Sequence, residues 1–209
     1  MTVEVSRVYL LDGGTGDGVE AELRDAIEQA QISDWERHWI PAILAAIQDL
    51  VARQVPHSGW PQSLHWCWPK KIARVQGLLA FRGFSVVAQG VTQGLAQLDL
   101  TKTCRELSQK GKPLIYVEYL EVAPWNRSEL CVLPRLRGVG TVMLTAAVAL
   151  SNEEGFKGRI GLHSLPQADA FYRKIGMTDL GPDPSYQNLR YFEMTVEQAC
   201  AFFEKEEGR

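Results

Sequence analysis

The apolar positions in the first eighty residues recur mostly at helical spacing. Residues 19–30 carry mixed charge with apolar residues four positions apart, which predicts an exposed helix. A second helix is expected to begin at the capping-box pattern Ser33-Asp34-Trp35-Glu36 and to kink or restart at Pro41. A short strand at residues 8–11 precedes both helices. We therefore expect residues 1–80 to form a variable, helical N-terminal part of the molecule.

From residue 84 onward the apolar pattern becomes that of strands. Two apolar runs joined through Gln89-Gly90 predict an antiparallel hairpin. Residues 114–123 form the strongest strand pattern, in which alternate side chains face opposite sides. Two carboxylates, Glu118 and Glu121, interrupt this otherwise apolar strand and fall on opposite faces. At least one of them needs an explanation other than packing.

The rest of the chain alternates helices with strands. The expected elements are, in order, a long apolar helix from Gly140 to Gly155, a strand at 159–163, a helix that carries Tyr172 and stops at Gly176, a strand at 189–194, and a terminal helix opened by the capping-box pattern Thr195-Val196-Glu197-Gln198. The long helix lies between two apolar strands, which predicts a parallel crossover. This order of elements predicts an α/β (α+β) fold.

Composition and charge exclude several classes of protein. Of the 209 residues, 45% are hydrophobic and 22% are charged, which are ordinary values for a globular chain. The net charge of −3 gives no general basic field, so a nucleic acid is an unlikely partner. The four cysteines lie far apart without metal-ligand spacing, so we expect reduced thiols and no metal. No apolar run is long enough for a membrane span, so we expect a soluble, cytoplasmic protein.

The candidate chemistry begins at the turn Arg135-Leu136-Arg137-Gly138-Val139-Gly140. Its two glycines stand where the long helix begins, so the backbone N–H groups of the first turn are open to an anion. The helix dipole and the two arginines add to this attraction. The alternative is a helix N-terminus whose glycines only allow close packing.

The order of parts and this turn resemble the GCN5-related N-acetyltransferase (GNAT) superfamily over residues 84–194. The acyl-CoA signature of that family, R/Q-x-x-G-x-G/A, is matched by Arg135, Gly138 and Gly140. Further along, Ala168, Tyr172 and Gly176 resemble its A-x-x-x-Y-x-x-x-G-F pattern. The resemblance implies a mixed, mostly antiparallel central sheet with a splayed parallel strand pair, flanked by helices. It also implies that residues 1–209 form a single domain with 84–194 as its acyl-CoA-binding core.

The resemblance further implies acetyl-CoA, or another acyl-CoA, as co-substrate. The strand that precedes the turn would pair with the pantetheine arm, and the turn would hold the pyrophosphate. The residues implied in cofactor binding are Leu120, Val122, Arg135, Arg137, Gly138, Val139, Gly140 and Thr141.

Amine acylation needs a base, a donor for the oxyanion and a proton for the leaving thiolate. The positions that resemble the base and the acid of the family are Glu118 and Tyr172. Glu121 is the rival base, because a bulge in the strand would exchange its faces; a third reading is that neither carboxylate serves. The alternative for Tyr172 is a core tyrosine. The oxyanion donor would be a backbone N–H near Leu120 to Val122.

Three segments depart from the family pattern. The stretch 124–134 is an insert that either covers the cofactor or forms part of the acceptor site. Leu165 stands where many members carry an asparagine that touches the pantetheine. The Trp- and His-rich segment 56–71 is either core or an aromatic pocket wall.

The expected function is therefore an N-acyltransferase that moves an acetyl group from acetyl-CoA to a primary amine by direct attack in a ternary complex. The acceptor would be a small molecule or a peptide, and a homodimer is possible by analogy. Two alternatives remain: a catalytically silent CoA-binding sensor, and a toxin that acetylates aminoacyl-tRNA. The acidic net charge counts against the toxin.

Overall fold

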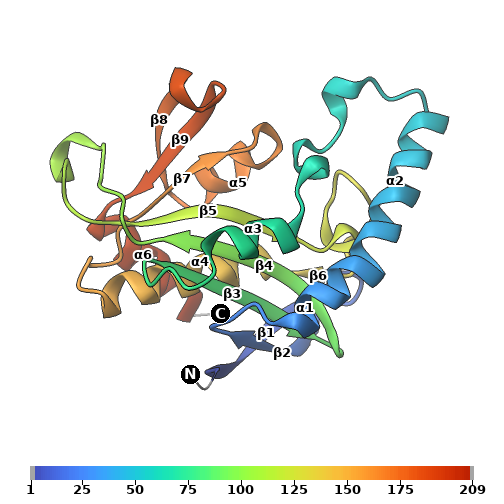
Figure 1. The fold of residues 1–209 in the computed structure, drawn as a ribbon, viewed down its shortest axis with the longest axis horizontal. Helices are drawn as coiled ribbons and strands as arrows, with labels where there is room; N and C mark the ends of the chain where they lie inside the picture. The colour runs from blue at the N-terminus through green and yellow to red at the C-terminus, as the bar shows by residue number, and fades with distance from the viewer. Residues whose placement is uncertain (1–2, 208–209) are drawn as a thin grey trace. The chain divides into compact units, whose positions relative to one another are not determined.

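A computed structural model describes residues 3–207 of the chain (Figure 1). Within that range the strands are β1 (Val5–Asp12), β2 (Gly18–Arg24), β3 (Phe81–Ala88), β4 (Val91–Asp99), β5 (Ile115–Val122), β6 (Leu136–Arg137), β7 (Ile160–Ser164), β8 (Thr178–Asp183) and β9 (Leu189–Met194). The α-helices are α1 (Gln29–Asp34), α2 (Ile40–Ala52), α3 (Trp68–Val75), α4 (Val139–Glu153), α5 (Asp169–Lys174) and α6 (Val196–Glu207). No helix of the described part is long and apolar enough to cross a membrane.

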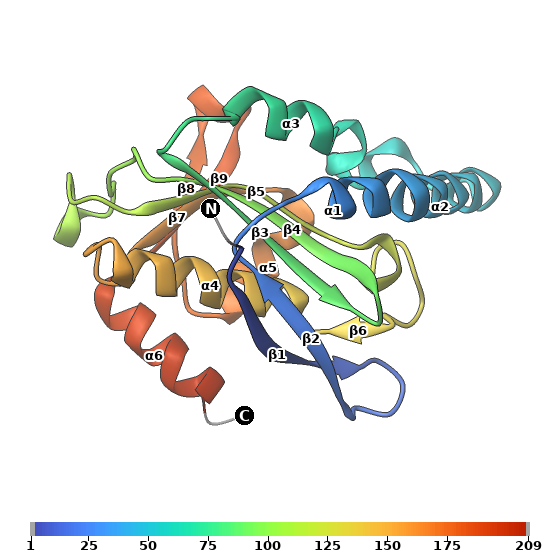
Figure 2. The same cartoon turned by 60° about the horizontal axis from the view of Figure 1, so that its bottom comes forward.

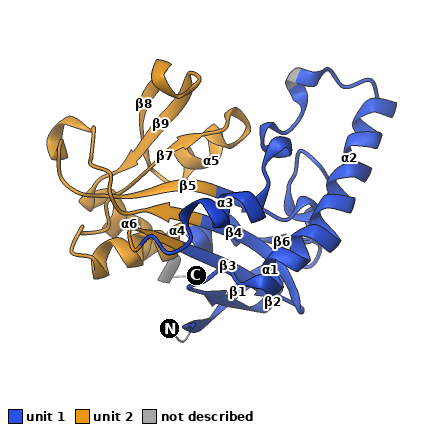
Figure 3. Ribbon diagram, in the orientation of Figure 1, with its two compact units in different colours: residues 1–78, 83–96, 120–143 blue, residues 79–82, 97–119, 144–209 orange. Residues whose placement is uncertain are grey.

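The strands form one mixed sheet in the order β6-β1-β2-β3-β4-β5-β7-β9-β8. The chain divides into two compact units (Figure 3). The first holds residues 1–78, 83–96 and 120–143, and the second holds 79–82, 97–119 and 144–209. β4, β5 and α4 each contribute residues to both units.

The first unit is built on an antiparallel edge. β1 pairs with β2, β2 pairs with β3, and the two-residue strand β6 pairs with β1 through Leu11 opposite Arg137. The hairpin predicted at Gln89-Gly90 is confirmed: both residues have positive φ, as a two-residue type I′ turn requires. The core of this unit lies under α4, where Leu10, Val86 and Met143 are buried together.

The helix expected at residues 19–30 is wrong, because the first half of this segment is strand β2 and α1 begins only at Gln29. Ala21 is buried, Val19 and Leu23 pack against the same core, and the acidic residues between them are exposed. This alternation has the period of a strand, and the four-residue spacing that suggested a helix is also a multiple of two. The short strand expected at residues 8–11 is confirmed as part of β1, whereas the expectation of a helical N-terminal part fails over β2.

The helix boundary at Ser33 is also wrong, and the restart near Pro41 is confirmed. α1 begins at Gln29, with a capping box between Glu28 and Gln31. A π-helical turn, Trp35–Trp39, follows directly and is closed by the Ile40 N–H donating to the Trp35 carbonyl. Because Pro41 lacks an N–H, the helix changes its hydrogen-bond register before α2 continues.

The second unit contains the parallel pair. β5 and β7 run parallel through three residue pairs, from Ile115 opposite Ile160 to Val117 opposite Leu162. β7 pairs antiparallel with β9, and β9 with β8. Figure 2 shows α6 next to α4, and both helices come close to Gly158. The parallel crossover, the stop at Gly155, the stop at Gly176 and the Thr195 capping box are confirmed.

The sequence pattern did not indicate β8. Gly181 has a positive φ of 88°, and the register of β8 against β9 shifts between Asp179 and Pro182. A glycine and a proline inside a six-residue strand remove the alternation by which a strand is recognised.

Candidate functional site

The glycine turn forms the entry to α4. Gly138 has a φ of 95°, a conformation that favours glycine, and α4 begins at the next residue. The Val142 N–H donates to the Gly138 carbonyl at 2.9 Å, which is the first hydrogen bond of the helix. The amides of Val139 and Gly140 precede that bond, so the helix itself offers them no acceptor. Val139 is buried, Gly140 is half-buried and Arg137 is exposed.

Strand β1 holds this turn in place. The Gly13 N–H donates to the Arg135 carbonyl at 2.8 Å, next to the β1–β6 pairing. A Cβ on Gly13 would lie 1.5 Å from the Pro134 carbonyl oxygen, so no other residue fits this close approach. The turn is therefore built by two segments more than a hundred residues apart.

Gly94 on β4 performs a similar role beneath the first turn of α4. A Cβ on Gly94 would lie 2.6 Å from the Val139 side chain and 2.8 Å from that of Met143. The start of α4 thus packs directly on the backbone of β4. In the sequence, Gly13 and Gly94 are indistinguishable from loop and strand glycines, and they were not predicted as part of the site.

The two carboxylates of β5 have different partners. Glu118, in the second unit, is half-buried and accepts a hydrogen bond from Gln97 Nε2 at 2.8 Å. It follows the last parallel pair between β5 and β7, so it stands where that ladder has ended. The Gln97 side chain is buried, and its carbonyl oxygen has no hydrogen-bond partner.

Glu121, in the first unit, is almost fully enclosed at 4% exposure. Trp68 Nε1 donates to one of its oxygens at 2.6 Å, and Arg127 Nη1 lies 3.5 Å from the other. Burial raises the pKa of Glu121, while the Trp68 hydrogen bond and the Arg127 charge act in the opposite direction.

Arg127 ties the insert to the aromatic segment. Its Nη1 donates to Ser63 Oγ at 3.1 Å, and its other nitrogens bind Glu129. The insert 124–134 and the segment 56–71 are therefore joined through Glu121, and the segment's Trp68 is completely buried. His65, by contrast, is exposed. Of the two interpretations of the segment 56–71, core or pocket wall, these contacts favour the core at Trp68.

The other predicted residues lie on both units. Leu120 and Val122 are partly buried and pack against the core of the first unit. Tyr172, in the second unit, is buried on α5, with its ring 5.3 Å from that of Phe171 and 5.6 Å from that of Phe192. Burial raises the pKa of Tyr172, so its phenol keeps its proton at neutral pH. Thr141 is half-buried in the first turn of α4.

The second unit contains a hydrogen-bonded chain that sequence reasoning missed. Tyr116 Oη lies 2.7 Å from His163 Nδ1, and His163 Nε2 lies 2.9 Å from Asp183 Oδ2. The Asp183 carboxylate also binds Arg105, and the exposed Tyr186 ring stacks on His163 at 4.0 Å. Burial lowers the pKa of His163, whereas hydrogen bonds from Ser185, Arg105 and His163 hold the pKa of Asp183 low.

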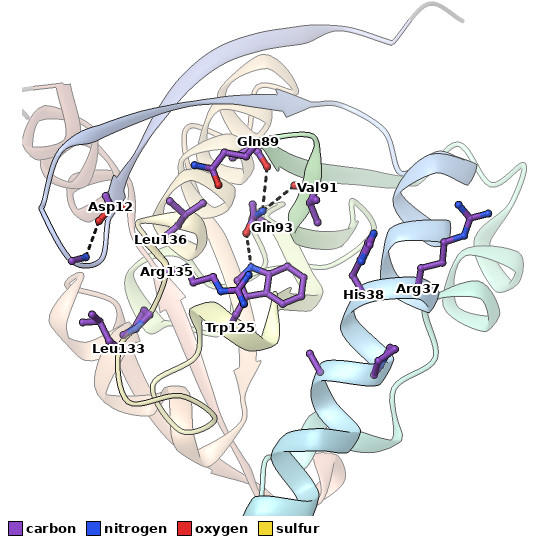
Figure 4. A pocket seen from close by; sticks show the side chains of 15 residues that line it. Asp12, Arg37, His38, Gln89, Val91, Gln93, Trp125, Leu133, Arg135 and Leu136 are labelled. Atoms are coloured by element: carbon purple, nitrogen blue, oxygen red, sulfur yellow. Dashed lines mark hydrogen bonds between the residues drawn. The ribbon is translucent and has the colours of Figure 1, made fainter.

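A pocket of about 780 Å³ lies in the first unit beside the turn (Figure 4). Figure 4 shows the Trp125 ring on one side, next to the Arg135 guanidinium, and His38 and Arg37 on the helical segment opposite. Trp125 is fixed by its N–H bond to Gln93 Oε1 at 2.9 Å and by an edge contact with Trp39 at 6.5 Å. Arg135 lies 5.4 Å above the Trp125 ring. In the described part of the chain, no group of three or more acidic, histidine or cysteine side chains could hold a metal ion.

The comparisons with known proteins identify the fold. No family model matches the chain, and no curated protein matches its sequence. Solved structures match over most of its length. A GNAT-family acetyltransferase from Listeria monocytogenes has a TM-score of 0.53 at 14% identity, covering 90% of this chain and 98% of its own.

Two further structures agree with this match. The GNAT domain of PAT from S. lividans has a TM-score of 0.53 at 17% identity, covering 91% of this chain and 96% of its own. RimJ from Mycobacterium smegmatis, in complex with CoA-disulfide, has a TM-score of 0.51 at 15% identity, covering 94% of this chain and 88% of its own. The chain therefore has the GNAT fold, as the resemblance implied: a mostly antiparallel sheet with one parallel strand pair and flanking helices.

Proposed function

We propose that this protein is an acyl-CoA-dependent N-acyltransferase, most simply an acetyltransferase that acts on a primary amine. The observation that carries the proposal is the entry to α4. Gly138 has a positive φ, the amides of Val139 and Gly140 precede the first helical hydrogen bond, and Arg137 is exposed beside them. An anion such as a pyrophosphate is favoured at such a helix N-terminus.

The chemical step requires three functions. The amine nitrogen attacks the thioester carbonyl carbon, the tetrahedral oxyanion collapses, and the carbon–sulfur bond breaks to release the CoA thiolate. We assign Glu118 as the base that accepts the amine proton, a backbone N–H near Leu120 to Val122 as the oxyanion donor, and the Tyr172 phenol as the donor of a proton to the thiolate.

The partners of the two carboxylates support Glu118 over Glu121. Glu118 has one hydrogen bond, from a neutral amide, whereas Glu121 already binds an indole N–H and a guanidinium. A base must have an oxygen free to take a proton. The Tyr172 phenol keeps its proton, as a general acid must. Because this phenol is buried among aromatic rings, the thiolate must gain access to it during the reaction.

The central experiment measures cofactor binding by thermal shift. We expect acetyl-CoA to raise the melting temperature of the wild type and Gly140→Arg to abolish the shift, because the arginine side chain would occupy the approach to the helix amides. Ala201→Arg, on an exposed position of α6, is the control and should keep the shift. A wild type that shows no shift with acetyl-CoA or with any longer acyl-CoA contradicts the proposal.

Turnover then separates an enzyme from a binding module. A panel of amines and peptides is incubated with acetyl-CoA, and free CoA is the readout. Release that depends on the amine supports the acyltransferase. A thermal shift without release by any amine indicates a catalytically silent CoA-binding protein.

A further inference from the structure

The pocket beside the turn collects cationic groups that have no acidic partner. Eight arginines of the described chain form ion pairs with carboxylates: Arg7, Arg24, Arg53, Arg82, Arg105, Arg127, Arg173 and Arg190. Arg37 and Arg135, which line the pocket, form none, and His38 lies next to Arg37. Arg137 in the glycine turn, Arg74 and Arg159 also have no ion pair within the described residues, but they do not line the pocket. The pocket differs from their positions because it brings two unpaired arginines and a histidine to one cavity.

The acidic residue in the pocket wall, Asp12, forms no ion pair within the described residues and binds the backbone of its own loop instead. Asp12 Oδ1 accepts the backbone N–H groups of Gly14 and Thr15, each at 2.9 Å, within its own loop (Figure 4). These bonds hold the pKa of Asp12 below its ordinary value. Guanidinium groups bind phosphate and carboxylate through paired N–H donors, so an unpaired arginine in a pocket favours such an anion.

One wall of the pocket faces away from the amides that begin α4. Gln93 lines the pocket, whereas the next residue of β4, Gly94, faces Val139 and Met143 of α4. Successive residues of a strand point to opposite faces, so the wall at Gln93 and the start of α4 lie on opposite faces of β4. Leu136 also lines the pocket and packs with Val139 in the core, so the pocket adjoins the turn, and a measurement with acetyl-CoA is needed to distinguish the two anion sites.

The shape of the pocket limits the size of its ligand. Its volume of about 780 Å³ lies within the range of small-molecule sites. Trp125 provides a rigid aromatic wall, because its indole N–H is bonded to Gln93 and its ring edge contacts Trp39. A small organic molecule with an anionic group fits these features better than an extended chain.

We propose that this pocket binds the anionic group of the acyl acceptor, so that the substrate is a small amine bearing a phosphate or a carboxylate. The inference rests on the proposed function, because only an acyltransferase has an acyl acceptor. Arg37 and His38 bind the anion, and Trp125 contacts the carbon skeleton. A neutral amine of the same size lacks the group that these side chains recognise.

Two measurements test the pocket. In the first, O-phosphoethanolamine, β-alanine and ethanolamine are titrated against the wild type by calorimetry without acetyl-CoA. We expect binding of the phosphate or the carboxylate probe at least about ten-fold tighter than that of ethanolamine, because a hydrogen bond to a charged group is lost with the neutral probe. The stronger of the two anionic probes identifies the source of the charge.

The variants identify the residues. Arg37→Gln with His38→Gln should weaken the preferred anionic probe about ten-fold or more and leave the acetyl-CoA thermal shift unchanged. Arg74→Gln is the matched control, because Arg74 is an exposed arginine on α3 without an ion pair and outside the pocket. If the double variant does not fold, Arg37→Lys is used, which keeps the charge and loses the paired donors.

Two of the remaining outcomes overturn the inference, and a third overturns the proposed function alone. If the three probes bind equally, or none binds, the pocket does not select an anion, even when acetyl-CoA still shifts the melting temperature. If the double variant loses the acetyl-CoA shift, the pocket belongs to the phosphates of CoA and not to the acceptor. If only the acetyl-CoA shift is missing from the wild type while anion selection persists, the proposed function fails and the anion site stands.

Discussion

Glu118 and Glu121 lie three residues apart on one strand, but they differ in burial and in hydrogen-bond partners. Glu121 is 4% exposed and joins Trp68 to Arg127, so it holds the segment 56–71 to the insert 124–134. Glu118 has only the Gln97 amide as hydrogen-bond partner and lies beyond the end of the β5–β7 ladder. Neighbours from distant parts of the chain thus make Glu121 a structural carboxylate and leave Glu118 with a single amide partner.

The first prediction separates the two glutamates. Glu118→Gln should lower kcat/KM on an identified acceptor by about 10² or more, the usual contribution of a general base, with little change in stability. Glu121→Gln should lower the free energy of unfolding by about 3 kcal/mol, because Arg127 loses its buried counter-charge. Urea unfolding and steady-state kinetics measure both. The reverse pattern would exchange the two roles.

The second prediction concerns His163, whose side chain is 3% exposed. Burial lowers the pKa of His163 in the folded protein. At pH values between this lowered pKa and the ordinary pKa of histidine, the unfolded chain therefore binds more protons than the folded protein does. Stability should therefore be complete above about pH 7, fall as the pH drops through the histidine's ordinary pKa, and level off below the folded value.

The measurement is the melting temperature between pH 5 and pH 8. In His163→Gln this part of the pH dependence should disappear, while His65→Gln, at an exposed histidine, should keep it. An unchanged profile for His163→Gln would mean that other groups cause the acid sensitivity.

Individual residues were the least predictable level of the structure. The Arg135, Gly138 and Gly140 signature was recognisable because its parts are adjacent in sequence. Tyr116, His163 and Asp183 come together only through strand pairing in the second unit, so their spacing carries no signal. Whether Glu118 and Tyr172 catalyse acyl transfer stays a prediction.

At the scale of elements, the sequence predicted most of the regular segments and missed the sheet edges. The hairpin at Gln89-Gly90, the parallel pair around α4 and the cap at Thr195 have short-range signals, and the structure contains them. β2, which lies between β1 and β3, was taken for a helix because its exposed charged residues and its apolar residues four positions apart fit both periods. The two-residue strand β6 is too short for any period.

The third prediction tests the contact between β1 and β6. Gly13→Ala places a Cβ against the Pro134 carbonyl oxygen, so β6 must move away from β1. We expect a loss of about 1 to 3 kcal/mol in stability, as for other overpacked sites, and a weaker acetyl-CoA thermal shift. Gly18→Ala, at the other end of the same loop and with its nearest atom 3.9 Å away, is the control. Equal behaviour of the two variants would show that the pairing does not hold the turn.

At the scale of the whole molecule, the tryptophans give a natural probe of cooperativity. All six lie in the first unit, whereas β4, β5 and α4 pass through both units. We predict that tryptophan fluorescence and far-ultraviolet circular dichroism report the same unfolding midpoint, since elements shared by both units couple them. Two separate midpoints would mean that the units unfold independently.

The fold class was predictable from the order of parts, because the helices and strands of the 84–194 region other than β6 and β8 have their own local patterns. The first eighty residues and the insert 124–134 had no such guide. Their structure depends on the contacts of Trp68 and Arg127 with Glu121, and on β6 with β1.

The β1–β6 pairing also has a consequence for the order of folding. Leu11 and Arg137 are neighbours in the sheet, and the chain between them must close a loop of more than a hundred residues before the pair can form. Contacts of such long sequence separation form slowly. In a refolding experiment, affinity for acetyl-CoA should therefore appear after most of the helical signal has returned. In a newly made chain, the glycine turn at 135–140 should become ordered only after β6 has paired with β1.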